Sequence, residues 1–164
     1  MLFIFVLAIL EYAVYLRSNS HFFQGDTIHW FYVRHKSVQE FLSAFVSLDS
    51  GGWYRPLANG SIQSIFYPLL GLTPTGYRVI QYLLFLAATI AVCKLARIIT
   101  GRKLAAYVAT LFFSLHTINV YTTYDLAFIP ELLYSFFYVC AVIFYLRQRQ
   151  KWAFVCFGVG LFSK

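Results

Sequence analysis

Three ionisable side chains in this sequence could act together on one substrate. They are Asp26, Arg55 and Asp125. A lone acid in a loop is usually only solvated. Two carboxylates and a guanidinium at a similar depth, however, could form a polar pocket that faces an anionic substrate. These residues can act together only if the secondary-structure elements that carry them place them side by side. The composition of the chain indicates what kind of elements these are.

The composition indicates an integral membrane protein. Of 164 residues, 60% are hydrophobic, 21% are aromatic and only 12% are charged, whereas soluble domains are about 25% charged. So few charges are too few for the surface of a soluble globule. The 18 Phe and 13 Tyr residues exclude a disordered chain. The net charge of +7 is divided among separate loops, which argues against nucleic acid as a partner.

Five apolar runs predict an all-α fold, a polytopic bundle of membrane-spanning helices. The runs cover residues 2–16, 76–99, 104–124, 128–146 and 152–164. A span needs about 17–25 residues, so we expect the fifth to be unfinished and residues 1–164 to form the N-terminal part of one transmembrane domain. The first run could instead be a signal-peptide core, but it lacks a preceding basic region and a following cleavage site. Glu11 interrupts it and is interpreted as a buried contact within the bundle.

Basic residues predict the orientation of the bundle, because cytoplasmic loops collect Lys and Arg. One basic cluster lies at residues 94–103 and another at residues 147–151. The opposite, outer face then receives residues 17–75 and the short turn at 125–130. Asp26, Arg55 and Asp125 therefore fall on the same side of the membrane, where the substrate could be lipid-linked.

The predicted outer loop, residues 17–75, is too long for a simple connection. It contains two amphipathic patterns of helical period. The first begins with Ser37 and Glu40 in the spacing of a capping box and continues to Val46. The second runs from Ile62 to Leu70. Such helices lie flat at a membrane interface, or alternatively pack on another protein domain.

Four short motifs resemble the GT-C glycosyltransferases, and most closely the dolichyl-phosphate-mannose-type protein O-mannosyltransferases. Tyr54–Leu57 matches the YRPL element of that group, and residues 71–78 resemble its GLNPFGYH segment. Leu115–Ile118 resembles its LHPI element, and residues 161–164 resemble the start of its LSKE element. The family usually carries two adjacent acids after the first span, whereas here Asp26 is followed by Thr27.

The resemblance implies roles for five residues. Asp26 would be the general base on the acceptor hydroxyl. Arg55, with Arg78 as a second candidate, would bind the donor phosphate, because a guanidinium can bind phosphate in a bidentate manner. Asp125 and His116 would position the acceptor, and Asp26 with Asp125 could hold a divalent metal ion. His116 is more readily explained as a hydrogen-bonded histidine within the bundle.

The predicted function is therefore an integral membrane glycosyltransferase. It would transfer mannose or a similar hexose from a polyprenyl-phosphate donor to a hydroxyl of a protein, lipid or glycan on the extracytoplasmic face. The expected location is a bacterial plasma membrane, or the endoplasmic reticulum membrane in a eukaryote. Two alternatives remain open, which are a multi-pass transporter or lipid flippase and a non-catalytic glycosyltransferase-like subunit. We expect the 164-residue chain alone to be inactive.

Overall fold

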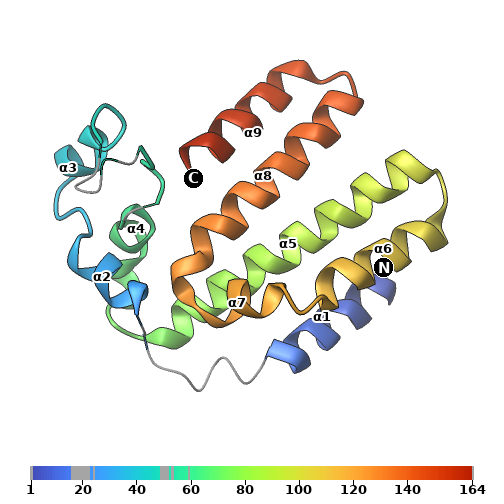
Figure 1. The fold of residues 1–164 in the computed structure, drawn as a ribbon, viewed down its shortest axis with the longest axis horizontal. Coiled ribbons are helices and arrows are strands. Elements are labelled where there is room, and N and C mark those ends of the chain that lie inside the picture. The colour runs from blue at the N-terminus through green and yellow to red at the C-terminus, as the bar shows by residue number, and fades with distance from the viewer. Residues whose placement is uncertain are drawn as a thin grey trace.

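Helices form all the regular structure in the described part of the chain. The computed structural model describes residues 2–15, 23, 25–48, 52, 54–58 and 60–163, without the side chain of Tyr121. Residues 16 and 164, which end two predicted spans, lie outside this part. The elements are α1 (Leu2–Tyr15), α2 (Asp26–Tyr32), α3 (Val38–Ser43), α4 (Ser61–Leu70), α5 (Pro74–Thr100), α6 (Lys103–Leu115), α7 (Asn119–Tyr124), the 3-10 helix η2 (Leu126–Phe128), α8 (Ile129–Leu146) and α9 (Gln150–Phe162). The predicted all-α fold is confirmed (Figure 1).

Among the described residues, two segments are long and apolar enough to cross a membrane, α5 and the continuous stretch Leu126–Leu146. They correspond to the predicted spans 76–99 and 128–146. At about 1.5 Å per residue, the 27 residues of α5 extend for about 40 Å. Pro74 begins this helix, where its missing N–H costs nothing. Gly101 ends it in a left-handed conformation with φ of 66°.

The predicted span 104–124 is divided into two helices. α6 ends at Leu115, His116 is extended with φ −67° and ψ 134°, and α7 starts at Asn119. Two local hydrogen bonds stabilise the break. The Asn119 side-chain amide donates to the Phe113 carbonyl, and the Ile118 N–H donates to His116 Nδ1 over 3.2 Å. Such side-chain bonds offer the backbone an alternative to the helix.

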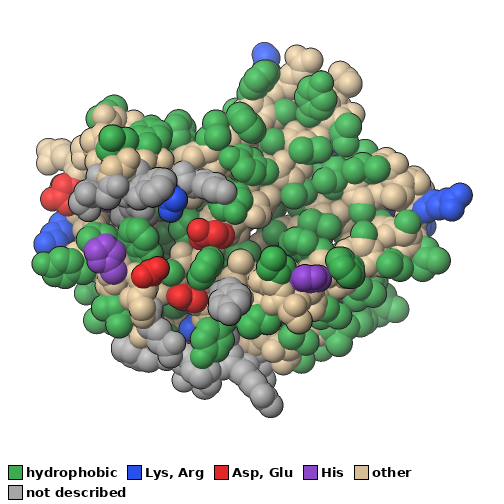
Figure 2. Space-filling view, in the orientation of Figure 1, with side chains coloured by type: hydrophobic (Ala, Val, Ile, Leu, Met, Phe, Trp, Pro, Cys, Tyr) green, Lys and Arg blue, Asp and Glu red, His purple; other side chains and the backbone are tan. Residues whose placement is uncertain are grey.

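The helices pack as hairpins with their ends aligned. α5 packs against both α6 and α8, and α8 packs against α9. The α5–α6 and α8–α9 turns lie at one end of the bundle, whereas α2, α3 and α4 lie at the other (Figure 1). Arg102, Lys103, Arg147 and Arg149 are exposed at the turns. The predicted outer loop and the basic turns are therefore at opposite ends. In Figure 2, Lys and Arg appear at the upper and right-hand ends and also on the left side, where the acids gather.

The segment of α2, α3 and α4, called here the loop module, has one helix more than the sequence predicts. That helix is α2. Ser37 caps α3 as predicted, because Ser37 Oγ accepts a hydrogen bond from the Glu40 N–H over 3.2 Å. Glu40 Oε2 in turn accepts from the Lys36 N–H over 2.7 Å, one residue earlier than a standard capping box. α3 is shorter than its apolar pattern and ends at Ser43.

An apolar cluster fixes the loop module to the bundle. Phe31 of α2 is 6% exposed and Tyr77 of α5 is 1% exposed, with their ring centroids 5.2 Å apart. Ile62 of α4 and Leu126 of η2 join the same cluster. The module is therefore packed against α5 and the start of α8, and this contact sets the position of α2.

Candidate functional site

Asp125 is held where α7 ends and η2 begins. Its Oδ1 accepts a hydrogen bond from the Ala127 N–H over 2.9 Å, which caps η2. The same oxygen accepts from Thr27 Oγ1 over 2.8 Å. The carbonyl oxygen of Asp125 accepts from Gln81 Nε2 of α5 over 2.7 Å. Contacts to two other helices thus fix both the backbone and the carboxylate of this residue.

Asp26 is the first residue of α2 and lies beside this contact. It is exposed, whereas its neighbour Thr27 is 1% exposed. Since Thr27 bonds Asp125, the structure brings the segments of the two predicted acids together although they are far apart in sequence. Asp26 remains open to solvent, as a base that must reach an acceptor hydroxyl would need to be.

Arg78 lies in the second turn of α5 and is 5% exposed. Its Nη1 donates to the carbonyl of Tyr124, to that of Thr123 at 3.5 Å and to Gln81 Oε1 at 3.4 Å. The negative charge of Asp125 also acts on the guanidinium. A cation at the last carbonyls of a helix is favourable, so Arg78 binds the end of α7 to α5. Its predicted contact with a donor phosphate stays a prediction.

Gln81 is a member of this cluster that the sequence analysis did not identify as a site residue. It is 1% exposed, and its Nε2 donates to the carbonyls of Thr122 and Asp125, both over 2.7 Å. The sequence feature that could have identified Gln81 is its position three residues after Arg78. Residues three apart on a helix share a face, so an amide three residues after Arg78 in an apolar helix indicates a shared polar contact.

Arg55 lies on the other side of the loop module, between α4 and the end of α9. It is half-buried. The Leu57 N–H donates to the Phe162 carbonyl over 2.8 Å, and Ser61 Oγ donates to the Pro56 carbonyl over 2.5 Å. These bonds fix the backbone that carries Arg55, as a phosphate-binding arginine requires.

His116 is exposed at the break between α6 and α7. In the described part of the chain its ring accepts the bond from Ile118 and contacts the Phe112 ring, with centroids 5.2 Å apart, and its carbonyl accepts from the Asn119 N–H over 3.0 Å. The structure therefore gives His116 a local role in ending α6. The prediction that it positions the acceptor is not supported by a contact with Asp26 or Asp125 among the described residues.

No group of three or more His, Cys, Asp or Glu residues that could hold a metal ion occurs among the described residues. The bonded cluster instead combines the Asp125 carboxylate with the Thr27 hydroxyl, the Arg78 guanidinium and the Gln81 amide, and Asp26 is next to Thr27 in the chain. Such a set can accept a proton at Asp26 while Asp125 and Arg78 stay fixed by backbone groups.

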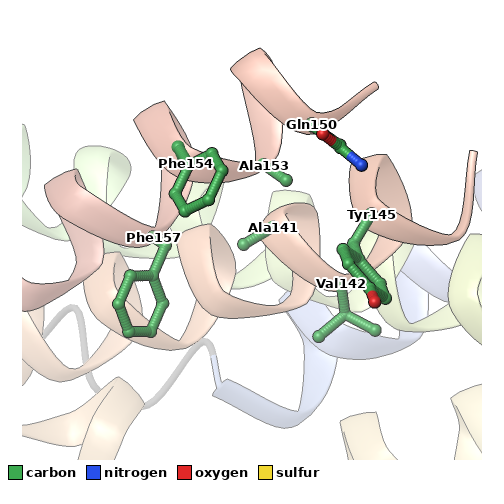
Figure 3. Close-up of a pocket in the computed structure, with 7 residues that line it drawn as sticks. All are labelled: Ala141, Val142, Tyr145, Gln150, Ala153, Phe154 and Phe157. Atoms are coloured by element: carbon green, nitrogen blue, oxygen red, sulfur yellow. The ribbon is translucent and has the colours of Figure 1, made fainter. Parts of the chain in front are cut away.

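A hollow lies between α8 and α9 and has a volume of about 410 Å³ (Figure 3). Its lining is apolar apart from Gln150 and the Tyr145 hydroxyl, and Phe154 and Phe157 of α9 are opposite Val142 of α8. It offers no acid or base for a reaction.

Comparison of the chain with protein-family models, with curated proteins and with solved structures finds no match.

Proposed function

We propose that the chain forms part of a membrane-embedded glycosyltransferase. It transfers a sugar, mannose or a similar hexose, from a polyprenyl-phosphate donor to a hydroxyl acceptor. The observation that carries the proposal is the 2.8 Å hydrogen bond from Thr27 Oγ1 to Asp125 Oδ1. It joins the two acidic segments that the sequence places on one face of the membrane.

The bond also accounts for the departure from the family pattern at position 27. Members of the family that the motifs resemble usually carry a second acid at this position. This chain has Thr27 there, and Thr27 binds the carboxylate of Asp125. The second carboxylate near Asp26 then comes from the turn between α7 and η2. In this proposal Asp26 takes the proton of the acceptor hydroxyl as it attacks the sugar, and Asp125 keeps the site negative.

The resemblance assigns the donor phosphate to Arg55, and we keep that assignment although no contact in the described part of the chain joins Arg55 to Asp26 or Asp125. The guanidinium of Arg78 is already bonded to the carbonyls at the end of α7 and to Gln81. Arg55 is half-buried on a backbone fixed by α4 and α9. A guanidinium there stays charged and can stabilise the phosphate as it leaves.

The membrane location rests on α5 and Leu126–Leu146, the two segments long and apolar enough to span. The exposed basic turns at the far end of the bundle support a cytoplasmic position for that end. The loop module then lies on the extracytoplasmic face of a plasma membrane, where a polyprenyl-phosphate sugar and its acceptor meet.

Replacing Asp26 by Asn in the full-length protein tests the proposal. We expect the rate of sugar transfer to fall by about 10²–10⁴-fold, with donor binding retained. Glu40→Gln is the matched control, because it removes a carboxylate from the same module but keeps the oxygen that accepts from the Lys36 N–H. Wild-type transfer by Asp26→Asn would contradict the role of Asp26 as base.

A second function, transport across the membrane, is favoured by one observation. The predicted third span is broken at residues 116–118, and broken helices with buried polar groups line transporter sites. Glu11 of α1 and Thr89 of α5 are both 0% exposed, so two polar side chains are buried inside the bundle. Substrate uptake by proteoliposomes without sugar transfer would establish this function instead.

A further inference from the structure

A groove of about 520 Å³ lies on the loop module, between residues 34–38 and α4. One wall carries three consecutive basic or titratable residues, Arg34, His35 and Lys36. Across from them are Ile65, Tyr67 and Pro68 of α4. The groove belongs to neither the Asp125 cluster nor the Arg55 segment.

Arg34 is fixed in place by its neighbours. Its Nη1 donates to the Phe31 carbonyl over 2.6 Å, and its guanidinium carbon lies 3.9 Å from the centroid of the Tyr67 ring. A cation over an aromatic ring is held by the ring quadrupole. Gly60 permits this arrangement, because a Cβ at that position would lie 2.9 Å from the Arg34 Cα. The guanidinium is therefore held ready for a ligand, with donors other than Nη1 still available.

The charge of the groove is positive. Lys36 is exposed, and its ammonium makes no ion pair in the described part of the chain. His35 is bound within the module, since its N–H donates to Ser64 Oγ over 2.7 Å and its Nε2 lies 3.1 Å from Ser61 Oγ. The carboxylate that contacts this segment is Glu40, which accepts from the Lys36 backbone. Two cations against one acid favour an anionic ligand.

Apart from Ser37 and Ser64, the rest of the groove lining is apolar, and part of it is exposed. Val38 is 74% exposed and Ile65 is 51% exposed, and next to them Leu42 and Leu69 are 59% and 83% exposed. A soluble anion would gain nothing from these side chains. A molecule with a negative headgroup and hydrocarbon chains would use both parts, because burying apolar surface contributes about 25 cal/mol per Å².

We propose that this groove binds an anionic phospholipid of the surrounding bilayer. The phosphate contacts Arg34 and Lys36, and the acyl chains lie over Val38, Ile65 and Leu69. The two segments that line the groove, residues 34–38 and α4, lie at the end of the bundle opposite the α5–α6 turn (Figure 1). In this proposal that end is at the depth where headgroups meet the apolar helices. The bound lipid fixes the height of the loop module at the membrane surface, and this role is independent of sugar transfer.

Crosslinking of a photoactivatable phosphatidylglycerol to the full chain in bilayer nanodiscs tests the proposal. We expect label on peptides from residues 34–41 and 61–70, and little label there from photoactivatable phosphatidylcholine. Lys36→Gln, which changes an exposed side chain, should reduce this label about fivefold, and Arg34→Gln/Lys36→Gln should reduce it more than tenfold. Arg147→Gln/Lys151→Gln is the control at the far end, and it should leave the label on these peptides unchanged.

Four outcomes would overturn the proposal. Equal labelling by the two lipids, or unchanged labelling in Lys36→Gln, would exclude an anionic phospholipid site. Loss of label in inorganic phosphate, but not in chloride of the same ionic strength, would assign the groove to a soluble anion. Displacement by an equimolar polyprenyl phosphate would assign it to the donor lipid. Thermal unfolding of each variant distinguishes a variant that fails to fold from one that folds but has lost the lipid site.

Discussion

Two regions of the molecule are stabilised in different ways. At the module end, α2, α5 and the α7–η2 turn meet through bonds from polar side chains to one another and to backbone carbonyls, centred on Arg78, Gln81 and Asp125. The α8–α9 hairpin packs through aromatic and small side chains, and its hollow is apolar. The module end is thus joined by a network of polar bonds, whereas the α8–α9 hairpin depends mainly on apolar packing.

The largest effect on stability is expected from a substitution that removes the polar contacts at the module end. Replacing Arg78 by Leu leaves the carbonyls of Thr123 and Tyr124 without their donor. We expect the free energy of unfolding to fall by about 2–3 kcal/mol, measured by denaturation in detergent. Arg97→Leu is the matched control, because Arg97 is exposed at the other end of the same helix. It should change stability by less than about 0.5 kcal/mol.

A smaller effect is expected in the apolar hairpin. A Cβ at Gly160 would lie 2.6 Å from Cε1 of the Tyr138 ring, whereas a Cβ at Gly158 meets nothing within 4 Å. Both residues lie in α9, so the gain in helix propensity on changing either to Ala is the same. We expect Gly160→Ala to be less stable than Gly158→Ala by about 1–3 kcal/mol. Equal unfolding midpoints would mean that α9 does not pack closely on α8.

The smallest effect on stability is expected from a substitution that tests the hydrogen bond between the two acidic segments. Thr27→Val keeps the shape of the side chain but removes the donor to Asp125. We expect a loss of about 0.5–1.5 kcal/mol in unfolding free energy, together with slower sugar transfer. Thr27→Ser retains the hydroxyl and should retain transfer. If Thr27→Val transfers as fast as Thr27→Ser, the bond does not contribute to the site.

Much of the fold could be predicted because hydropathy and end signals agree. α5 has a long apolar run between Pro74 and Gly101, and α4 follows its apolar period to Leu70. The break after α6 could not be predicted from hydropathy, because residues 104–124 are apolar enough to be interpreted as one membrane span. It depends on the bonds of Asn119 and His116 to nearby backbone. α2 was not predicted because its short segment has no clear period, and it is stabilised by packing of Phe31 on Tyr77.

The site could be predicted only in part. The Lys and Arg pattern correctly placed Asp26 and Asp125 at one end of the bundle, because that inference needs only the order of the helices. The roles of Thr27 and Gln81 depend on distances between helices, which no local pattern contains. Arg78 was predicted only as a second candidate for binding the donor phosphate. Its burial against the end of α7 follows from how closely α5 and α7 approach.

The hydrogen bond from Leu57 to Phe162 has a consequence for biosynthesis. The backbone that carries Arg55 emerges from the ribosome well before its partner at the end of α9. At about 5–20 residues per second, on the order of ten seconds separates the two. During that interval the Arg55 segment has its contacts within the loop module, such as the bond from Ser61 to Pro56 and the bond from Tyr54 to Phe45, but not the bond to Phe162. The last contacts of the loop module are therefore completed late, and a nascent chain stalled before Phe162 would present that segment without its final support.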